Sequence, residues 1–407
     1  MASSVDTTGK LCLDWRVPGH VERSGPSGVR TVPFNRPSLV GDEIDNILEA
    51  IRRGQLSGDG HFTRECNRIV CRLTGTKAAL LTHSCTAALE MAAILADLEA
   101  GDEVIMPSFT FVSTANAVVL RGAVPVFVDI DPETLNIDPA AAAAAVSPRT
   151  RAIFAVHYAG FPADMDALAE VAQAHDLLLV EDAAQALGSR YKGRLAGSLG
   201  DLAAFSFHET KNIISGEGGA LTVNRPDLVP RAEIIREKGT NRSLFLRGQV
   251  DKYTWVDVGS SFLPGELITA FLHAQLSRAE EITARRLGMF DRYMDAFADL
   301  EASGRLRRPR WSPDCEGNGH MFYLLLRDID DRDAFIGHLR KQGTIAPFHY
   351  VPLHSSPAGV RFARASGDLS VTDDISARLV RLPLFFCLGG EIDHVIQQAR
   401  QYLEQAS

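Results

Sequence analysis

The sequence Leu177-Leu178-Leu179-Val180-Glu181-Asp182 is followed, further along the chain, by Ser206-Phe207-His208-Glu209-Thr210-Lys211-Asn212. The first segment is a short apolar run that ends on two carboxylates, which predicts a buried strand leading into a polar turn. The second places Lys211 five residues after Ser206, just ahead of Gly216-Glu217-Gly218-Gly219. The chain has seven lysines against 35 arginines, so a solvated surface side chain is a weaker explanation for Lys211 than for a common residue.

Short apolar runs alternate with helical stretches on both sides of these segments. We predict strands at residues 79–81, 103–106, 124–128, 151–156, 177–180, 203–207 and 219–223, with helices such as 87–98, 111–120 and 165–174 between them. This alternation indicates an α/β fold with a mixed, mostly parallel, seven-stranded sheet covered on both faces. Ligands of such sheets bind at the carboxyl ends of the strands, where Thr86, Asp182 and Ser206–Lys211 would meet.

The chain divides into three predicted parts. Residues 1–30 are rich in Ser, Gly, Pro and Arg and predict a mobile extension. Residues 31–282 form the large domain, which begins with a helix at 44–51 and ends in a long helical stretch at about 267–296. Residues 283–407 read as a smaller C-terminal α+β domain with a strand at 321–326, a helix at 333–342 and a terminal helix after Glu391.

Composition narrows the classes of function. The 407 residues are 45% hydrophobic and 23% charged, as in ordinary globular enzymes. A net charge of −9 argues against nucleic acid as the main partner. No apolar run approaches the roughly 20 residues of a membrane span, and no signal peptide is evident at the start. Six scattered cysteines without a CxxC pair predict reduced thiols and a cytoplasmic protein.

A carboxylate at a strand end near a lysine is what a pyridoxal phosphate (PLP) site needs. Asp182 would hold a proton on the pyridine nitrogen and make the ring an electron sink, and Lys211 would form a Schiff base with the cofactor. Taken alone, Asp182 is better explained as a turn cap and Lys211 as a surface residue. Their pairing favours the cofactor.

Other residues at the strand ends suit the same cofactor. Ser84-Cys85-Thr86-Ala87-Ala88 opens a helix whose free N–H groups suit a phosphate, although Thr86 is an equally good ordinary N-cap. Ser206 would add a hydroxyl, and Gln185 would donate to the ring's phenolic oxygen. Phe111 would stack on the ring, although an aromatic residue at a helix start is more often part of a core.

Several other kinds of site are disfavoured. The Gly216–Gly219 loop follows a helix-like segment instead of opening a helix, so it is not a dinucleotide fingerprint. No HExxH, GxSxG or Walker pattern is present. His349 and His354 lack a third clustered ligand, so we predict no metal. We place both histidines in a loop of the second domain that faces the active site.

These motifs resemble those of the DegT-like family of fold-type-I, PLP-dependent sugar-nucleotide aminotransferases, over nearly all of residues 32–385. The landmarks are Ser84-Cys85-Thr86-Ala87-Ala88-Leu89, Pro107-Ser108-Phe109-Thr110-Phe111-Val112, Glu181-Asp182-Ala183-Ala184-Gln185 and Ser206-Phe207-His208 with Lys211-Asn212. Residues 236–243 and 247–255 are typical of the dTDP-4-dehydro-6-deoxy-D-glucose 4-aminotransferases within that family.

The resemblance implies roles for single residues. Lys211 would anchor the cofactor, Asp182 would contact its ring nitrogen and Gln185 its ring oxygen. The phosphate contacts implied are Thr86, Ala87 and Ser206, with Phe111 stacked on the ring. We expect His349 and Arg242 to contact the substrate.

The resemblance also implies a reaction and an assembly. L-Glutamate would aminate dTDP-4-dehydro-6-deoxy-D-glucose, giving a dTDP-4-amino-4,6-dideoxy-hexose and 2-oxoglutarate in deoxyaminosugar biosynthesis. The implied homodimer has its active site at the subunit interface. Many family members carry an asparagine that reaches across to the cofactor phosphate, where this chain has Leu263; Ser260 or Ser261 is a possible replacement.

Three alternatives remain. Pyridoxamine-phosphate-dependent sugar dehydratases resemble this family but replace the lysine with histidine, whereas Lys211 is present. A PLP-binding regulator without turnover would be expected to have lost a catalytic residue. An amino-acid aminotransferase is disfavoured because the C-terminal arginine motif that clamps a substrate carboxylate is missing.

Overall fold

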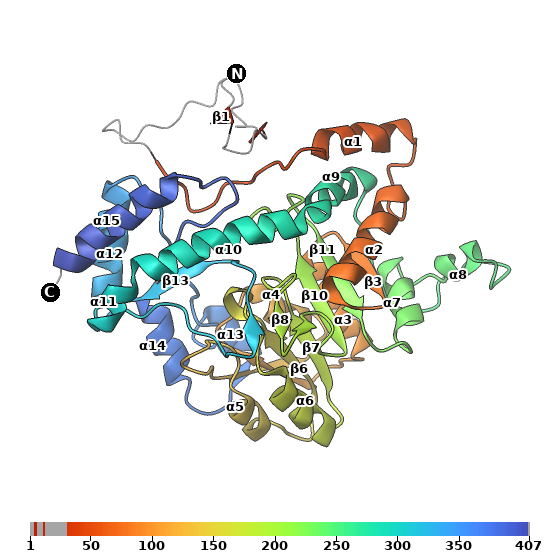
Figure 1. The fold of residues 1–407 in the computed structure, drawn as a ribbon. Coiled ribbons are helices and arrows are strands. Elements are labelled where there is room, and N and C mark those ends of the chain that lie inside the picture. The colour runs from red at the N-terminus through yellow and green to blue at the C-terminus, as the bar shows by residue number, and fades with distance from the viewer. Residues whose placement is uncertain (1–3, 6–10, 13–30, 406–407) are drawn as a thin grey trace.

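The computed structural model describes residues 4–5, 11–12 and 31–405, and an eight-stranded sheet lies at its centre (Figure 1). The strand order is β14-β5-β4-β6-β7-β10-β11-β3, and only β11 runs against the others. The strands are β3 Ala79–Thr82, β4 Glu103–Pro107, β5 Val124–Val128, β6 Thr150–Val156, β7 Leu178–Asp182, β10 Leu202–Ser206, β11 Gly219–Val223 and β14 Arg364–Ala365. The seven predicted strands are confirmed, and β14 adds an eighth from the C-terminal part of the chain.

Helices cover both faces of this sheet because successive strand residues point to opposite sides. Val104 and Met106 face one core, with α3, α4 and α7, whereas Ile105 between them faces the other, with α5 and α6. Helix α2 covers the β3 end of that second face. The helices are α2 His61–Thr74, α3 Cys85–Leu95, α4 Val112–Val119, α5 Pro139–Ala144, α6 Met165–Ala174 and α7 Val229–Arg236. The expected α/β fold with a covered, mostly parallel sheet is confirmed.

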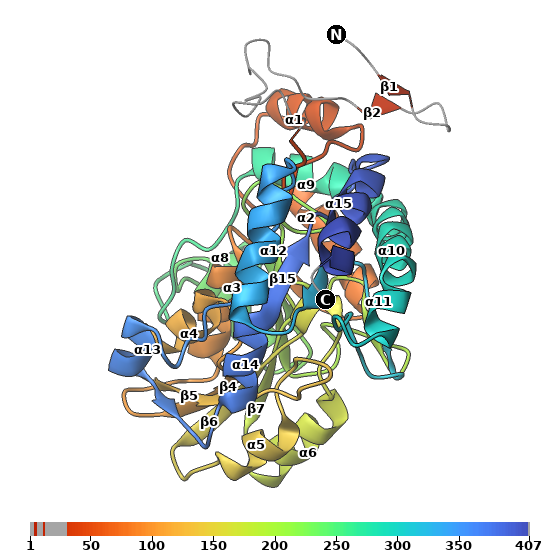
Figure 2. The same cartoon turned by 90° about the vertical axis from the view of Figure 1, so that its left-hand side faces the viewer.

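The C-terminal part of the chain builds a smaller layer beside the sheet. Its two-stranded antiparallel sheet pairs β13 with β15, and α12 and α15 lie side by side over it (Figure 2). The elements are α11 Ala298–Ala302, β13 Phe322–Leu325, α12 Ile329–Lys341, α13 Pro357–Phe362, α14 Ser370–Arg378, β15 Leu379–Leu382 and α15 Glu391–Gln405. The strand, the helix and the terminal helix predicted in this part are confirmed.

The helical stretch predicted at 267–296 is divided in two. Helix α9, Glu266–Ser277, and helix α10, Ala279–Ala296, are separated at Arg278, which has φ −116°. The domain boundary predicted at residue 282 falls inside α10 and stays a prediction.

Shorter elements complete the fold. Helix α1, Glu43–Arg52, packs on α9, and Asp42 precedes it without forming a side-chain cap. Helix α8, Arg242–Leu246, lies on an arm that projects from the body (Figure 1). The small elements are β8 Arg190–Tyr191, β9 Arg194–Leu195, β12 Cys315–Glu316 and the 3-10 turn Tyr158–Gly160. Most of the extension predicted at residues 1–30 lies outside the described residues; the described pieces are β1 Ser4–Val5 and β2 Leu11–Cys12, which pair antiparallel.

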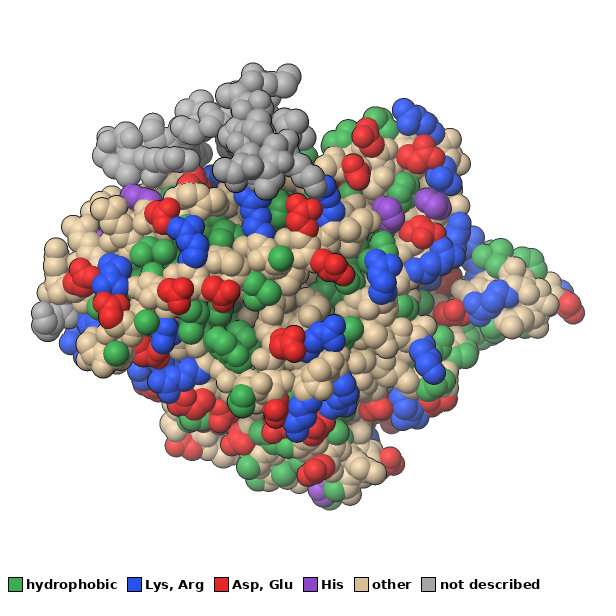
Figure 3. All heavy atoms as spheres, viewed as in Figure 1, with side chains coloured by type: hydrophobic (Ala, Val, Ile, Leu, Met, Phe, Trp, Pro, Cys, Tyr) green, Lys and Arg blue, Asp and Glu red, His purple; other side chains and the backbone are tan. Residues whose placement is uncertain are grey.

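The cysteines depart from the expectation of a fully reduced set. Cys66, Cys71, Cys85 and Cys315 are free, whereas Cys387 is disulfide-bonded. Within the described part of the chain, no helix combines the length and the apolar composition needed to cross a bilayer. On the face drawn in Figure 3, acidic and basic side chains are interspersed and neither sign forms a continuous field.

Candidate active site

Asp182 is the last residue of β7 and lies at the carboxyl edge of the sheet, as predicted. Its side chain is held from two sides: Thr114 Oγ1 in α4 donates to Oδ2 at 2.7 Å, and the N–H of Ala184 donates to Oδ1 at 3.2 Å. Burial raises the pKa of Asp182, and these two donors oppose that shift. The carboxylate is therefore fixed in position and largely removed from water.

Lys211 lies in the loop between β10 and β11, next to Asp182 in space. Burial lowers the pKa of the Lys211 amine, while the negative charge of Asp182 acts in the opposite direction. The loop is fastened by its neighbour Asn212, which donates to the carbonyl of Asn318 at 2.9 Å and contacts His320 Nδ1 at 3.0 Å. Asp182 and Lys211 thus interact electrostatically, one from the end of β7 and the other from the loop after the neighbouring parallel strand β10.

The N-terminus of α3 opens toward the same edge. Ser84, not Thr86, is its N-cap, because Ser84 Oγ accepts the N–H of Ala87 at 3.1 Å. Among the described residues, the N–H groups of Cys85 and Thr86 have no acceptor. The Thr86 hydroxyl contacts Ser113 Oγ at 2.7 Å. Ala87, predicted as a phosphate contact, has its N–H engaged in the cap, so that contact stays a prediction.

Gly219 permits this arrangement. It begins β11 opposite Ser206, the last residue of β10. A Cβ on Gly219 would lie 2.4 to 2.5 Å from backbone atoms of Ser84 and Cys85. A residue without a side chain is therefore required where the hairpin passes the start of α3.

Gln185 and two tyrosines form one wall. The Gln185 carbonyl oxygen accepts the N–H of Ala159 at 2.8 Å, and its amide nitrogen donates to Tyr350 Oη at 3.0 Å. The Tyr158 hydroxyl contacts His349 Nδ1 at 3.1 Å. Burial lowers the pKa of His349, with the charges of Arg381 and Lys211 acting in the same direction. His349 is thus a neutral imidazole beside the lysine.

Phe111 is 58% exposed at the position before α4, so the alternative of a plain core residue is wrong. Its ring is free to face a ligand.

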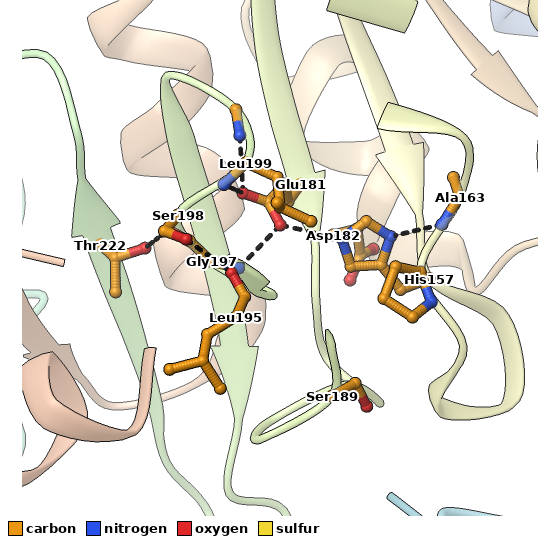
Figure 4. A network of polar contacts seen from close by, with 12 residues as sticks. His157, Ala163, Glu181, Asp182, Ser189, Leu195, Gly197, Ser198, Leu199 and Thr222 are labelled. Atoms are coloured by element: carbon orange, nitrogen blue, oxygen red, sulfur yellow. Dashed lines mark hydrogen bonds and ion pairs between the residues drawn. The ribbon is translucent and has the colours of Figure 1, made fainter. Parts of the chain in front are cut away.

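A buried network lies beneath Asp182 (Figure 4). Glu181 is fully buried and accepts the N–H groups of Gly197, Leu199 and Gly200 at 2.7 to 2.8 Å. It also contacts His157 Nε2 at 2.9 Å, and His157 Nδ1 accepts the N–H of Ala163. The proton of the neutral imidazole is therefore assigned to Nε2, facing Glu181. These bonds fix the end of β7 and the turn that follows β6.

Two predicted residues lie elsewhere. Arg242 begins α8 on the projecting arm and pairs with Glu237 at 3.1 Å, away from Lys211 in this chain. His354 contacts Ser108 Oγ at 2.8 Å and lies 3.4 Å from Asp373, so only His349 of the two histidines belongs to the site. No group of three metal-ligating side chains occurs within the described ranges.

Sequence reasoning missed several residues of the site. Ser113 and Thr114 follow Phe111 after one intervening residue, Val112, so hydroxyls placed soon after the predicted stacking residue were an available signal. Tyr350 adjoins His349. Cys85, whose thiol pKa is raised by burial and by Asp182, stands inside the quoted Ser84–Ala88 motif.

The residues present fit PLP. The unused N–H groups at the start of α3, with the hydroxyls of Thr86 and Ser206 nearby, suit a dianionic phosphate. Asp182 offers a buried carboxylate to a ring nitrogen, and Lys211 offers a half-buried amine to a carbonyl carbon.

Comparisons with known proteins agree with this geometry. The model of the DegT/DnrJ/EryC1/StrS aminotransferase family matches residues 37–400. The spore coat polysaccharide biosynthesis protein SpsC of Bacillus subtilis (strain 168) is 34% identical over 392 residues, covering 92% of this chain and 98% of SpsC.

Solved structures give the same picture. The aminotransferase TlmJ from Streptoalloteichus hindustanus superposes with a TM-score of 0.83 at 30% identity, covering 91% of this chain and 98% of TlmJ. The PLP form of the putative sugar aminotransferase Spr1654 from Streptococcus pneumoniae gives a TM-score of 0.83 at 26% identity, covering 92% and 99%.

Proposed function

The chain belongs to the DegT/DnrJ/EryC1/StrS aminotransferase family, and from that premise we propose that it aminates the C4 ketone of dTDP-4-dehydro-6-deoxy-D-glucose with L-glutamate as the donor. The products would be a dTDP-4-amino-4,6-dideoxy-hexose and 2-oxoglutarate. The observation that carries the proposal is that Lys211, in the loop after β10, interacts with the buried Asp182 at the end of the neighbouring parallel strand β7.

The cofactor is pyridoxal phosphate, which alternates with pyridoxamine phosphate in this family. When bound, it supplies an electron sink for the electrons released as a proton leaves the donor's α-carbon. Asp182 would keep its ring nitrogen protonated, and burial strengthens that contact because the carboxylate has little competing water. Cys85, Thr86 and Ser206 would hold its phosphate, and Phe111 would cover one face of its ring.

Lys211 would first anchor the cofactor and then move protons. Its amine is displaced by the donor's amine, accepts the proton from the donor's α-carbon, and later returns a proton to C4 of the sugar. This role needs a neutral amine, and the lowered pKa of Lys211 favours that form.

The first test is the absorbance of the PLP-loaded protein during the two half-reactions. L-Glutamate should remove the visible band of PLP, and dTDP-4-dehydro-6-deoxy-D-glucose should restore it. Lys211→Ala should abolish both changes. Lys192→Ala, which removes an exposed lysine paired with Asp166, should leave them intact.

Each failure has a separate meaning. A Lys211→Ala protein that still aminates the sugar would overturn the assigned lysine. A response to glutamate without a response to the sugar would exclude this substrate and leave the family's chemistry in place. A wild-type protein that binds PLP but responds to neither substrate would indicate the regulator.

We also propose a homodimer with the active site at the subunit interface. Arg242 and the rest of the α8 arm project away from Lys211 of their own chain, which suits a contact with a second copy (Figure 1). The exposed apolar face of α1 supports the same assembly.

A further inference from the structure

Arg381 lies in β15, the strand that pairs antiparallel with β13 in the C-terminal part of the chain. Its guanidinium stands 4.4 Å from the ring centroid of Phe34. One of its nitrogens, Nη2, reaches the carbonyl of Phe348 at 3.4 Å. Its Nε is buried and has no acceptor among the described residues. The planar fork that suits a carboxylate is thus left largely unused.

The charge of Arg381 is also unpaired. The buried Arg236, by contrast, pairs with Asp59 at 2.6 Å. Within the described part of the chain, Arg381 forms no ion pair, and the groups that favour its charge are the phenols of Tyr158 and Tyr350. Arg381 is half-buried, and a partly desolvated cation without a counter-ion costs free energy, so an anionic ligand would be stabilised there.

Arg381 acts directly on the site. Burial is the main cause of the lowered pKa values of His349, Lys211 and His320. The positive charge of Arg381 lowers all three further. Tyr350, which is electrostatically coupled to Arg381, accepts a hydrogen bond from the Gln185 amide at 3.0 Å in the same wall. The unpaired cation is therefore within electrostatic reach of the reacting amine.

We propose that Arg381 binds the α-carboxylate of the amino donor. The inference rests on the proposed function and deepens it, because it names the group that recognises the donor. The α-carboxylate is bonded to the carbon that loses its proton, so it must lie beside Lys211 during the reaction. The diphosphate of the sugar nucleotide is attached across the sugar ring from C4, so its partner must lie farther from Lys211. The position of Arg381 favours the carboxylate.

This role revises one expectation from the sequence. The missing C-terminal arginine motif for a substrate carboxylate disfavours an amino-acid aminotransferase. Arg381 supplies such a cation for the donor in the first half-reaction, without making the acceptor an amino acid.

The test measures the two half-reactions separately in the PLP-loaded protein with Arg381→Gln, with Arg381→Lys as a variant that keeps the charge. We expect Arg381→Gln to raise the L-glutamate concentration for half-maximal rate roughly 10- to 100-fold, the usual effect of losing a charge-assisted pair. The keto-sugar concentration for half-maximal rate should change less than about threefold. Arg381→Lys should fall between Gln and wild type. The matched control is Arg340→Gln, which removes an exposed arginine from α12.

Two further readouts separate carboxylate binding from a structural role. Calorimetry with α-methyl-L-glutamate, which has no α-proton, should show the same loss of affinity in Arg381→Gln. L-Glutamic acid α-amide should react poorly with wild type, and Arg381→Gln should discriminate against it less. The rise of the donor half-reaction with pH should also move to higher pH in Arg381→Gln, because a positive charge that lowers the pKa of Lys211 is gone.

The outcomes are distinct. Unchanged glutamate dependence in a folded Arg381→Gln protein would overturn the proposal, as would a selective loss of keto-sugar binding, which would give Arg381 to the diphosphate. If Arg381→Gln weakened both half-reactions equally and still discriminated against the amide as wild type does, Arg381 would have a structural role and the proposal would be overturned. The donor half-reaction is measured without the sugar. If the proposed sugar is wrong, the proposed substrate is excluded and the test of Arg381 remains valid.

Discussion

At the scale of single residues, Asp182 shows how the site combines charge with burial. Its two carboxylate oxygens are held by different parts of the chain, Thr114 in α4 and Ala184 just after β7. Burial alone would favour the protonated acid, and these donors oppose that tendency. The protonated ring nitrogen of pyridoxal phosphate would be a third hydrogen-bond donor to Asp182, so bound cofactor would further stabilise the carboxylate.

Asp182→Asn should therefore keep the shape of the site and lose its charge. We expect the donor half-reaction to slow by about 10²- to 10³-fold, the usual effect of removing one preorganised electrostatic group. Stopped-flow absorbance with L-glutamate measures this rate. Asp166→Asn, on the exposed side of α6, should leave it within about twofold of wild type. A rate in Asp182→Asn close to wild type would remove Asp182 from the chemistry.

The residues that sequence reasoning found and missed differ in a physical way. Lys211 and Asp182 were predictable because each follows a recognisable apolar strand, and strand ends of a parallel sheet converge. The role of Arg381 was not predictable from the sequence, because it rests on the lack of a counter-ion in the folded chain. Only the fold shows this, because β15 places Arg381 where it interacts electrostatically with Tyr158 and Lys211 and with no carboxylate partner among the described residues.

At the scale of elements, the close passage of β11 over the start of α3 shapes the phosphate end of the site. Gly219→Ala would place a Cβ within 2.4 to 2.5 Å of the Ser84–Cys85 backbone, which has to move. We expect a loss of PLP affinity of roughly tenfold or more and a stability loss of about 1–3 kcal/mol from overpacking. Fluorescence titration with PLP and thermal unfolding measure the two effects.

The control for this substitution is Gly288→Ala in α10, where an added Cβ meets nothing within 4 Å. Alanine is the better helix former, so Gly288→Ala should leave PLP affinity unchanged and should not destabilise the fold. Equal PLP affinity in Gly219→Ala and wild type would show that the start of α3 does not hold the cofactor.

The edge strand β14 is tied to the sheet by a buried carboxylate. Arg364 in β14 donates to both oxygens of Glu103 at 2.7 and 3.1 Å, and Ser147 and Arg149 also donate to it. These partners lower the pKa of Glu103 to about 2, below its usual 4.5. The resulting stabilisation is complete above pH 4.5 and is lost as the pH falls toward 2.

Glu103→Gln should accordingly lower the free energy of unfolding at pH 7 by about 2 kcal/mol, a value reduced for the partial exposure of both arginines. Much of this difference should vanish near pH 2.5. Denaturant unfolding at the two pH values measures it. Asp299→Asn, which breaks an exposed pair with Arg400, should change stability far less. A Glu103→Gln difference that does not depend on pH would contradict the ion-pair explanation.

Elements with strong local patterns were predictable, and those set by distant partners were not. Seven strands of the sheet carry clear apolar runs. Strand β14 has two residues and owes its place to pairing with β5 and to Glu103. The break between α9 and α10 at Arg278 likewise has no glycine or proline to announce it.

At the scale of the whole molecule, the α1 helix presents an apolar face that the chain does not cover. Ile44, Leu48 and Ile51 lie at helical spacing and are 52%, 43% and 52% exposed. Ile47 and Ala50 contribute to the small core beneath the helix, with Phe62 and Ala270. Leu267 and Ile268 at the start of the adjoining α9 are also exposed, so the apolar surface continues across both helices. Such a continuous apolar surface marks an interface.

We therefore expect the wild-type protein to sediment at twice the 44.3 kDa mass of the chain, and Ile44→Glu/Ile51→Glu to sediment as a single chain. Two buried carboxylates without partners would outweigh the contacts that the apolar face makes in the dimer. Leu120→Glu, at an isolated position that is 68% exposed, is the matched control and should remain dimeric. If the active site needs the second copy, the Ile44→Glu/Ile51→Glu protein should lose turnover in step with the dimer as it is diluted. A dimeric double variant would show that this face lies outside the interface, and a fully active monomer would show that one chain holds the complete site.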